Sequence, residues 1–212
     1  MTPWNIVGMA KVKGLDVITL TDHNCACNLP QAMLAGRAYG VQVLAGIEIT
    51  AKEDVHLLAY FADTEAAVAF GEEVYTRLPD ITNRADLFGN QIIIGDDDEQ
   101  VSLAQKLLLN AIDLSVDEID AWVCAAGGVC VPAHINRGAN GMIGALGLMP
   151  PLPRFPVVEV CQQLNCSPDA VKGRLILHAS DAHQLADIAE QGFSLDVPAP
   201  TAKHVFDYLK QR

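Results

Sequence analysis

Histidines and acidic residues gather at the ends of apolar, strand-like runs in this chain. Four of its six histidines lie there: His23, His56, His134 and His183. Carboxylates accompany them, as Asp22 does beside His23, while Glu48 and Asp181 each follow an apolar run of their own. Imidazole and carboxylate groups together suit hard and borderline divalent metal ions. The sequence therefore predicts a metal site where several strands end.

The elements that would position these side chains alternate between strand and helix. Apolar runs predict strands over about 16–21, 42–49, 55–61, 129–132, 156–160 and 174–179. Capping residues and periodicity predict helices over about 3–14, 29–40, 64–77, 103–110, 115–126, 139–147, 168–172 and 201–210. This alternation indicates an α/β fold with a mostly parallel sheet. Because the candidate ligands come from several strands spread over the chain, we expect a barrel rather than an open sheet.

Length and composition bound the kind of protein. The 212 residues suit a single domain over 1–212, with an irregular insertion at about 79–100 that holds one strand near 91–94. No apolar run is long enough for a membrane helix, and the first residues do not resemble a signal peptide. The six cysteines show no framework spacing, so we expect reduced thiols and a cytoplasmic location.

The charge balance bears on partners. The net charge is −12, whereas proteins that bind nucleic acid usually carry a basic face, so we do not expect nucleic acid as a partner. Bound metal ions would still make the active-site end locally positive. The acidic run at 96–99 is interpreted as a solvated loop, with contact to a metal or partner as the alternative.

Five short segments carry a family resemblance. In chain order they are Thr21-Asp22-His23-Asn24, Gly46-Ile47-Glu48, Val55-His56, Pro132-Ala133-His134 and Ser180-Asp181-Ala182-His183. Their order resembles the PHP family, named for polymerase and histidinol phosphatase, whose members are metal-dependent phosphoesterases. The resemblance implies a distorted seven-stranded β/α (TIM-like) barrel that holds two or three divalent metal ions.

The resemblance also implies roles for individual residues. The implied metal ligands are His23, Glu48, His56, His134, Asp181 and His183. Glu48, His56 and His134 would bind one metal, His23 and His183 another, and Asp181 with Glu48 a third. Asp22 would orient an imidazole. Arg137 would contact a phosphate group through its planar donor fork, with a structural ion pair as the alternative.

One part of the family pattern is absent. The family begins with a strand that ends in His-x-His, but no histidine precedes His23 here and no His-x-His occurs. We therefore expect a PHP-like barrel whose first strand is missing, through a truncated reading frame or a truncation made by engineering. Such a chain would bind about one to two metal ions, and its open edges at 16–21 and 174–179 would favour a homo-oligomer.

The implied function is hydrolysis of a phosphate ester of a small nucleotide or sugar phosphate by metal-activated water, with zinc, manganese, iron or magnesium as the cofactor. We expect this activity to be impaired in this chain, because the first strand is missing. The alternative is a degenerate, non-catalytic domain that binds metal or phosphate. Metal-dependent amide hydrolysis on a similar barrel ranks last, because no lysine follows a suitable strand end.

Overall fold

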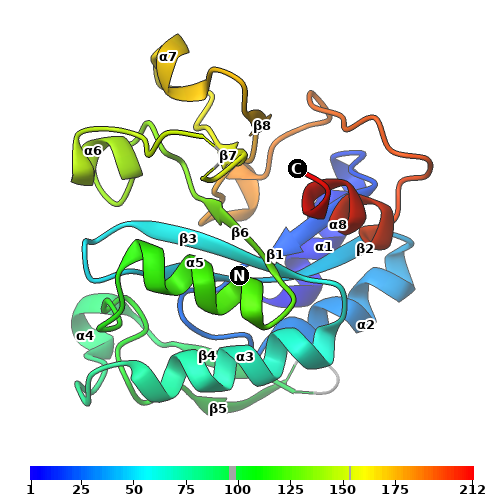
Figure 1. Ribbon diagram of the computed structural model, residues 1–212. Coiled ribbons are helices and arrows are strands. Elements are labelled where there is room, and N and C mark those ends of the chain that lie inside the picture. Colours follow the sequence, from blue (N-terminus) through cyan, green and yellow to red (C-terminus); the bar gives the residue numbers. More distant parts are fainter. Residues whose placement is uncertain (96–98, 153) are drawn as a thin grey trace.

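A four-stranded sheet lies at the centre of a mixed α/β fold in the computed structural model, which describes residues 1–95, 99–152 and 154–212 (Figure 1). Its strand order is β1 (Val17–Leu20), β2 (Gln42–Thr50), β3 (His56–Phe61) and β6 (Val129–Pro132). Two smaller sheets pair β4 (Ile92–Ile94) with β5 (Gln100–Leu103), and β7 (Val157–Glu159) with β8 (Leu175–Leu177). The prediction of an α/β fold is confirmed.

The direction of β3 differs from the rest of the central sheet. β1 and β2 run parallel, but β3 is antiparallel to both β2 and β6, so the prediction of a mostly parallel sheet is wrong for this sheet. The reason is that residues 51–55 are too few for a crossover connection and can only form a hairpin. As a result, the amino end of β3 lies at the same edge as the carboxyl ends of β1, β2 and β6.

Helices follow most strands. They are α1 (Pro3–Val12), α2 (Leu29–Tyr39), α3 (Thr64–Arg77), α4 (Ala85–Phe88), α5 (Val116–Ala125), α6 (Met142–Leu146), α7 (Pro168–Val171) and α8 (Ala202–Lys210), with a 3-10 turn at Leu185–Asp187. Thr2 caps α1, and Ser115 with Glu118 forms the expected capping box of α5. The chain thus keeps most of the predicted elements, within about three residues at their ends.

The predicted helix at 103–110 is wrong. The Gln91 side chain donates to the carbonyls of Ala104 and Lys106 at 3.1 and 2.8 Å and accepts from the Leu108 amide at 2.8 Å. These bonds use backbone groups that a helix would need for itself, and they hold the segment as turns that follow β5. Most of the acidic run predicted as a solvated loop, residues 96–98, lies outside the described residues.

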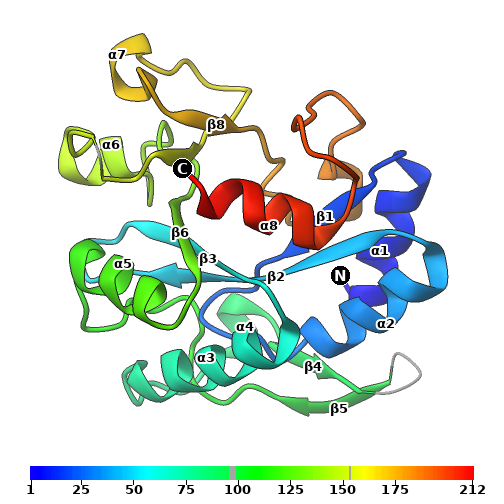
Figure 2. The ribbon, with the colours of Figure 1, turned by 45° about the vertical axis from the view of Figure 1, so that its right-hand side comes forward.

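The two faces of the central sheet are covered differently. On β2, Val43, Ile47 and Ile49 point into the larger core, on the face where α1, α2, α3 and α5 pack (Figure 1). Leu44 lies on the opposite face of the sheet, which we call the inner face. There it packs in a second apolar cluster with Phe206 of α8. Figure 2 shows α8 lying across the sheet beside β2. Because side chains alternate along a strand, Glu48 shares the inner face with Leu44.

The strands do not close into a barrel within the described ranges. β1 forms hydrogen bonds to β2 alone, and β8 to β7 alone, so each has a free edge among the described residues.

The described helices include none with the length and apolar character to cross a bilayer.

Candidate metal centre

The buried carboxylate of Glu48 lies at the centre of a cluster of imidazoles. Glu48 is near the carboxyl end of β2 and only 5% exposed. His23 follows β1, His134 follows β6, and His56 is the first residue of β3. Since β3 runs against the other strands, its first residue meets the last residues of its neighbours at one edge of the sheet.

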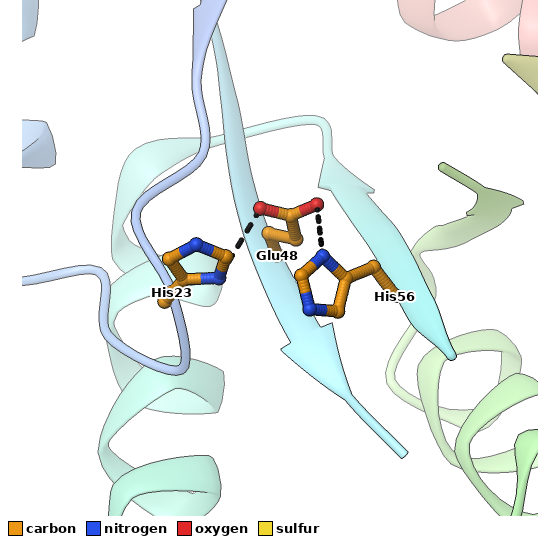
Figure 3. Close-up of side chains that lie close together, drawn as sticks. All are labelled: His23, Glu48 and His56. Carbon is orange, nitrogen blue, oxygen red and sulfur yellow. Dashed lines mark hydrogen bonds and ion pairs between the residues drawn. The ribbon is translucent and has the colours of Figure 1, made fainter. Parts of the chain in front are cut away.

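Three histidine rings surround this carboxylate at contact distance. His56 Nδ1 lies 3.0 Å from Oε1, His134 Nε2 lies 3.3 Å from the same oxygen, and His23 Nδ1 lies 3.3 Å from Oε2. Figure 3 shows His23 and His56 on either side of Glu48. The structure therefore brings together four of the six predicted ligands in direct contact.

The loop that carries His23 is fixed by its neighbour Asn24. The Asn24 amide group donates to the carbonyls of Leu108 and Asn110 at 2.8 and 3.0 Å, and its oxygen accepts from the Thr50 backbone at 3.1 Å. Its own backbone N–H donates to the Glu48 carbonyl at 2.7 Å. This role could not be predicted from the sequence, because the side-chain partners of Asn24 come from segments far along the chain.

Asp181 and His183 stand further out. One oxygen of Asp181 lies within 4.8 Å of ligand atoms of both Glu48 and His134. The side chain of His183 is 64% exposed, its Nδ1 lies 2.8 Å from the Asp181 carbonyl, and its ring centroid lies 6.2 Å from that of His23. Asp181 therefore belongs to the cluster by distance, whereas His183 lies at its rim.

Arg137 makes an ion pair with Asp181. The structure thus shows the ion pair that the sequence left as the alternative to a phosphate contact. The Arg137 side chain is 44% exposed, so it borders both the cluster and solvent.

Asp22 lies half-buried beside the cluster, and burial raises the pKa of its carboxyl group. Its carboxylate accepts a hydrogen bond from the Asn28 side-chain amide at 3.1 Å. Among the described residues, no hydrogen bond joins Asp22 to an imidazole. Asn28 occupies the N-cap position of α2 without a capping bond, because its side chain also bonds Ile92 and Ile94 of β4. Asp22 therefore orients this loop in the structure.

Glu159 is a second buried carboxylate, which the sequence analysis did not single out. It ends β7, is 6% exposed, and accepts the backbone N–H of His134 at 3.2 Å. Burial raises the pKa of its carboxyl group to about 7. The signal was present, because Val157-Val158-Glu159 repeats the pattern of an apolar run that ends in a carboxylate.

The electrostatics of the cluster favour an ionised Glu48. Burial alone would raise the pKa of this carboxyl group, but the bonds from His134 and His56 outweigh burial and hold the pKa well below its ordinary value. Burial lowers the pKa of His23, whereas for His134 the effect of burial is overcome by Glu48, which raises the pKa. An anionic oxygen among imidazole nitrogens is a donor set that a divalent cation can use.

A cavity of about 500 Å³ opens beside the cluster. Its wall includes Asp22, His23, Glu48, Glu159, Asp181 and His183. It also runs along the free edge of β1 and the segment that follows β8. A molecule in this cavity would therefore contact the candidate ligands directly.

This chain is similar to known proteins in structure, whereas comparisons of its sequence found no match. No protein-family model matches the sequence, and no curated protein matches it. A candidate metal-dependent phosphoesterase from Bifidobacterium adolescentis is 20% identical, with a TM-score of 0.56 over 90% of this chain and 87% of that one. The lesion-specific endonuclease Q of Pyrococcus furiosus is 18% identical, with a TM-score of 0.65 over the whole of this chain.

Endonuclease Q has also been solved with a duplex that carries an abasic lesion at the active site, and that structure gives 17% identity and a TM-score of 0.62. This chain spans about half the length of endonuclease Q, 51% and 52% in the two structures. At these identities the likeness concerns the fold. The comparisons show that the chain shares its fold with this candidate phosphoesterase and with endonuclease Q, in agreement with the resemblance to the PHP family.

Proposed function

We propose that the chain is a metal-dependent hydrolase of phosphate esters. The observation that carries the proposal is the buried Glu48 carboxylate with three imidazoles around it, at the wall of a cavity. A buried charge is costly unless it is paired or coordinates a metal, and a group of this kind at the wall of a cavity is a candidate for a functional site. The PHP-type fold, which the chain shares with a candidate phosphoesterase and an endonuclease, supports the same reaction class.

The described side chains fit a divalent ion in two overlapping groups. His23, Glu48 and His56 form one, and Glu48, His134 and Asp181 form the other, with ligand atoms within 4.8 Å of each other in each group. Glu48 belongs to both groups, so its carboxylate would serve as a ligand in either one. His183 at the rim would complete the first group. The ions, zinc, manganese, iron or magnesium, would supply an activated water and Lewis-acid stabilisation of the phosphoryl group.

The protein's own residues would then orient the substrate. Arg137 lies next to Asp181 and carries a planar donor fork that matches two phosphate oxygens. Glu48, held ionised by its imidazoles, keeps the negative charge in place between the two ligand groups. Asp22 and Asn28 fix the loop between β1 and α2, which carries His23.

For the substrate we propose a small nucleotide or sugar phosphate. The cavity volume of about 500 Å³ lies in the range of sites for small molecules. Nucleic acid is the second candidate substrate, favoured by the likeness to endonuclease Q. The net charge of −12 argues for the small substrate.

The full seven-stranded barrel is part of the proposal. The free edges of β1 and β8 and the cavity that follows them support a place for one further strand there. A chain extended by a strand that ends in His-x-His is expected to bind more metal and to hydrolyse faster than the 212-residue chain. The degenerate, non-catalytic alternative predicts metal binding without turnover in both.

Hydrolysis of 4-nitrophenyl phosphate and of bis(4-nitrophenyl) phosphate with manganese tests the function. The extended chain, its Glu48→Gln variant and the 212-residue chain are compared, with bound metal measured by elemental analysis. We expect turnover in the extended chain that Glu48→Gln abolishes. Equal rates with and without Glu48, or chains that take up no zinc or manganese, would refute the proposal.

A further inference from the structure

We infer that Glu159 is a positioning residue for His134: its carboxylate holds the backbone of the turn that presents the imidazole to Glu48. The inference rests on the proposed metal centre, to which it adds a residue outside the ligand set. Glu159 makes hydrogen bonds to two consecutive peptide groups of this turn.

These two bonds tie the end of β7 to the turn after β6. The Glu159 side chain accepts the His134 N–H at 3.2 Å, and the Glu159 carbonyl accepts the Ile135 N–H at 2.9 Å. β6 ends at Pro132 and its described ladder is with β3, so neither bond belongs to a strand pair. The His134 turn therefore depends on Glu159 for its attachment to β7.

The backbone at His134 needs such support. His134 has φ = 28°, in the left-handed region that a residue with a β-carbon rarely adopts. The turn continues with a bond from the Arg137 N–H to the His134 carbonyl at 2.9 Å. A strained residue persists only where its neighbours over-determine its conformation, and the Glu159 side chain is the polar partner of its N–H.

Stability alone does not account for a carboxylate at this place. Glu159 is 6% exposed, and no lysine or arginine of the described residues pairs with it. A buried carboxyl group loses hydration that an apolar side chain would not lose. Its bond to the backbone of a candidate ligand gives it a role at the metal centre instead, because partners that orient a ligand govern metal affinity.

Three variants separate positioning from a general effect on stability. Glu159→Ala removes the acceptor, whereas Glu159→Gln keeps an oxygen that can accept from the His134 N–H. Val157→Ala is the matched control, since Val157 is buried on the same strand and has no bond to the turn. Zinc affinity is measured by competition with a chromogenic chelator, and amide exchange of the metal-free proteins is followed at His134.

We expect Glu159→Ala to weaken zinc binding about 10- to 100-fold, as loss of an orienting partner does. The same variant should exchange the His134 amide at least about tenfold faster, because the amide loses its acceptor. Glu159→Gln should stay within about threefold of the wild type in both measurements. Val157→Ala should lower the melting temperature while it leaves zinc affinity and the His134 amide within the same range.

The inference is overturned if Glu159→Ala leaves the His134 amide protected, or if Glu159→Gln is as damaging to zinc binding as Glu159→Ala. The second result would show that the charge binds the metal itself. Wild-type protein that takes up no zinc would count against the proposed function. The exchange measurement would still decide whether Glu159 holds the turn.

Discussion

His56 Nδ1 lies 3.0 Å from a carboxylate oxygen of Glu48, although the two residues are not cross-strand partners. In the β2–β3 pair, Glu48 faces Leu58 and His56 faces Thr50. The imidazole therefore reaches diagonally along the inner face of the sheet. The contact depends on the register of this hairpin, because a slip of one residue would turn Glu48 to the opposite face.

Replacement of Glu48 by glutamine should disrupt the candidate metal centre. The variant keeps the shape of the side chain but removes the charge that three imidazoles share. We expect zinc or manganese affinity to fall by more than the ~10- to 100-fold typical of losing an orienting partner. Titration of metal into the purified variant measures this. Glu72→Gln, on an exposed position of α3, is the control, and similar losses in both variants would count against the centre.

Protons should compete with metal for His134. Its pKa is raised above the ordinary 6.5 because Glu48 overcomes the effect of burial, so near neutral pH the metal must displace a proton. Metal affinity is therefore expected to fall as the pH is lowered through this range, with proton release on binding. Calorimetry in two buffers of different ionisation enthalpy detects the release. Affinity that does not change with pH would contradict the assignment of His134 as a ligand.

The metal-free protein should show the opposite trend in stability. The raised pKa of His134 stabilises the fold below pH 6.5, and that contribution is lost as pH rises through the raised value. The lowered pKa of Glu48 stabilises the fold above pH 4.5, and that contribution is lost as pH falls through the lowered value. Between the two ordinary values both contributions are present. Urea titrations give the free energy of unfolding of the wild type and of His134→Gln at each pH. The wild type should exceed the variant most near pH 4.5–6.5, and the difference between the two should shrink at alkaline pH.

Truncation of Asn24 should destabilise the fold as well as the ligand loop. Asn24→Ala leaves three backbone partners without their hydrogen bonds: the carbonyls of Leu108 and Asn110 and the Thr50 N–H. Since each unsatisfied buried group costs about 1–3 kcal/mol and relaxation recovers part, we expect a loss of about 2–4 kcal/mol. Urea denaturation measures it. Asn90→Ala, at an exposed position, should change stability by less than ~0.5 kcal/mol.

The free edge of β1 should promote association of the chain. Its backbone groups lack a strand partner among the described residues, and a second copy can pair with them. Light scattering at micromolar concentration should show a dimer or larger species. Ile18→Lys, on β1, should reduce it, whereas Val12→Lys, at an exposed apolar position of α1, should not. A monodisperse monomer in the wild type would contradict this prediction.

The sequence predicted the cluster because each contributor sits where an apolar run begins or ends. His23, Glu48, His56 and His134 could be found in this way, and the structure places them in contact. The reversed direction of β3 was not predicted, although the five residues before it allow only a hairpin. The turns at 104–108 could not be predicted, because they depend on the side chain of Gln91 from another strand region.

Glu159 shows a different limit of sequence reasoning. Like Glu48, Glu159 ends an apolar run in the sequence. Its contact with the His134 backbone arises because β6 and β7 lie side by side in the fold, although a long connection separates them in the chain. Local patterns identify chemically suitable residues. Which backbone group each one meets is decided by packing between distant segments.

The hairpin that places His56 beside Glu48 has a consequence for how the centre forms during synthesis. His23, Glu48 and His56 lie close in sequence, so a nascent chain can gather them early at a small entropic cost. His134 and Asp181 leave the ribosome much later and would then join a cluster whose first half had formed without them. An ion captured by the early trio would therefore act as a template on which the later strands dock, and metal supply during translation would influence the yield of folded protein.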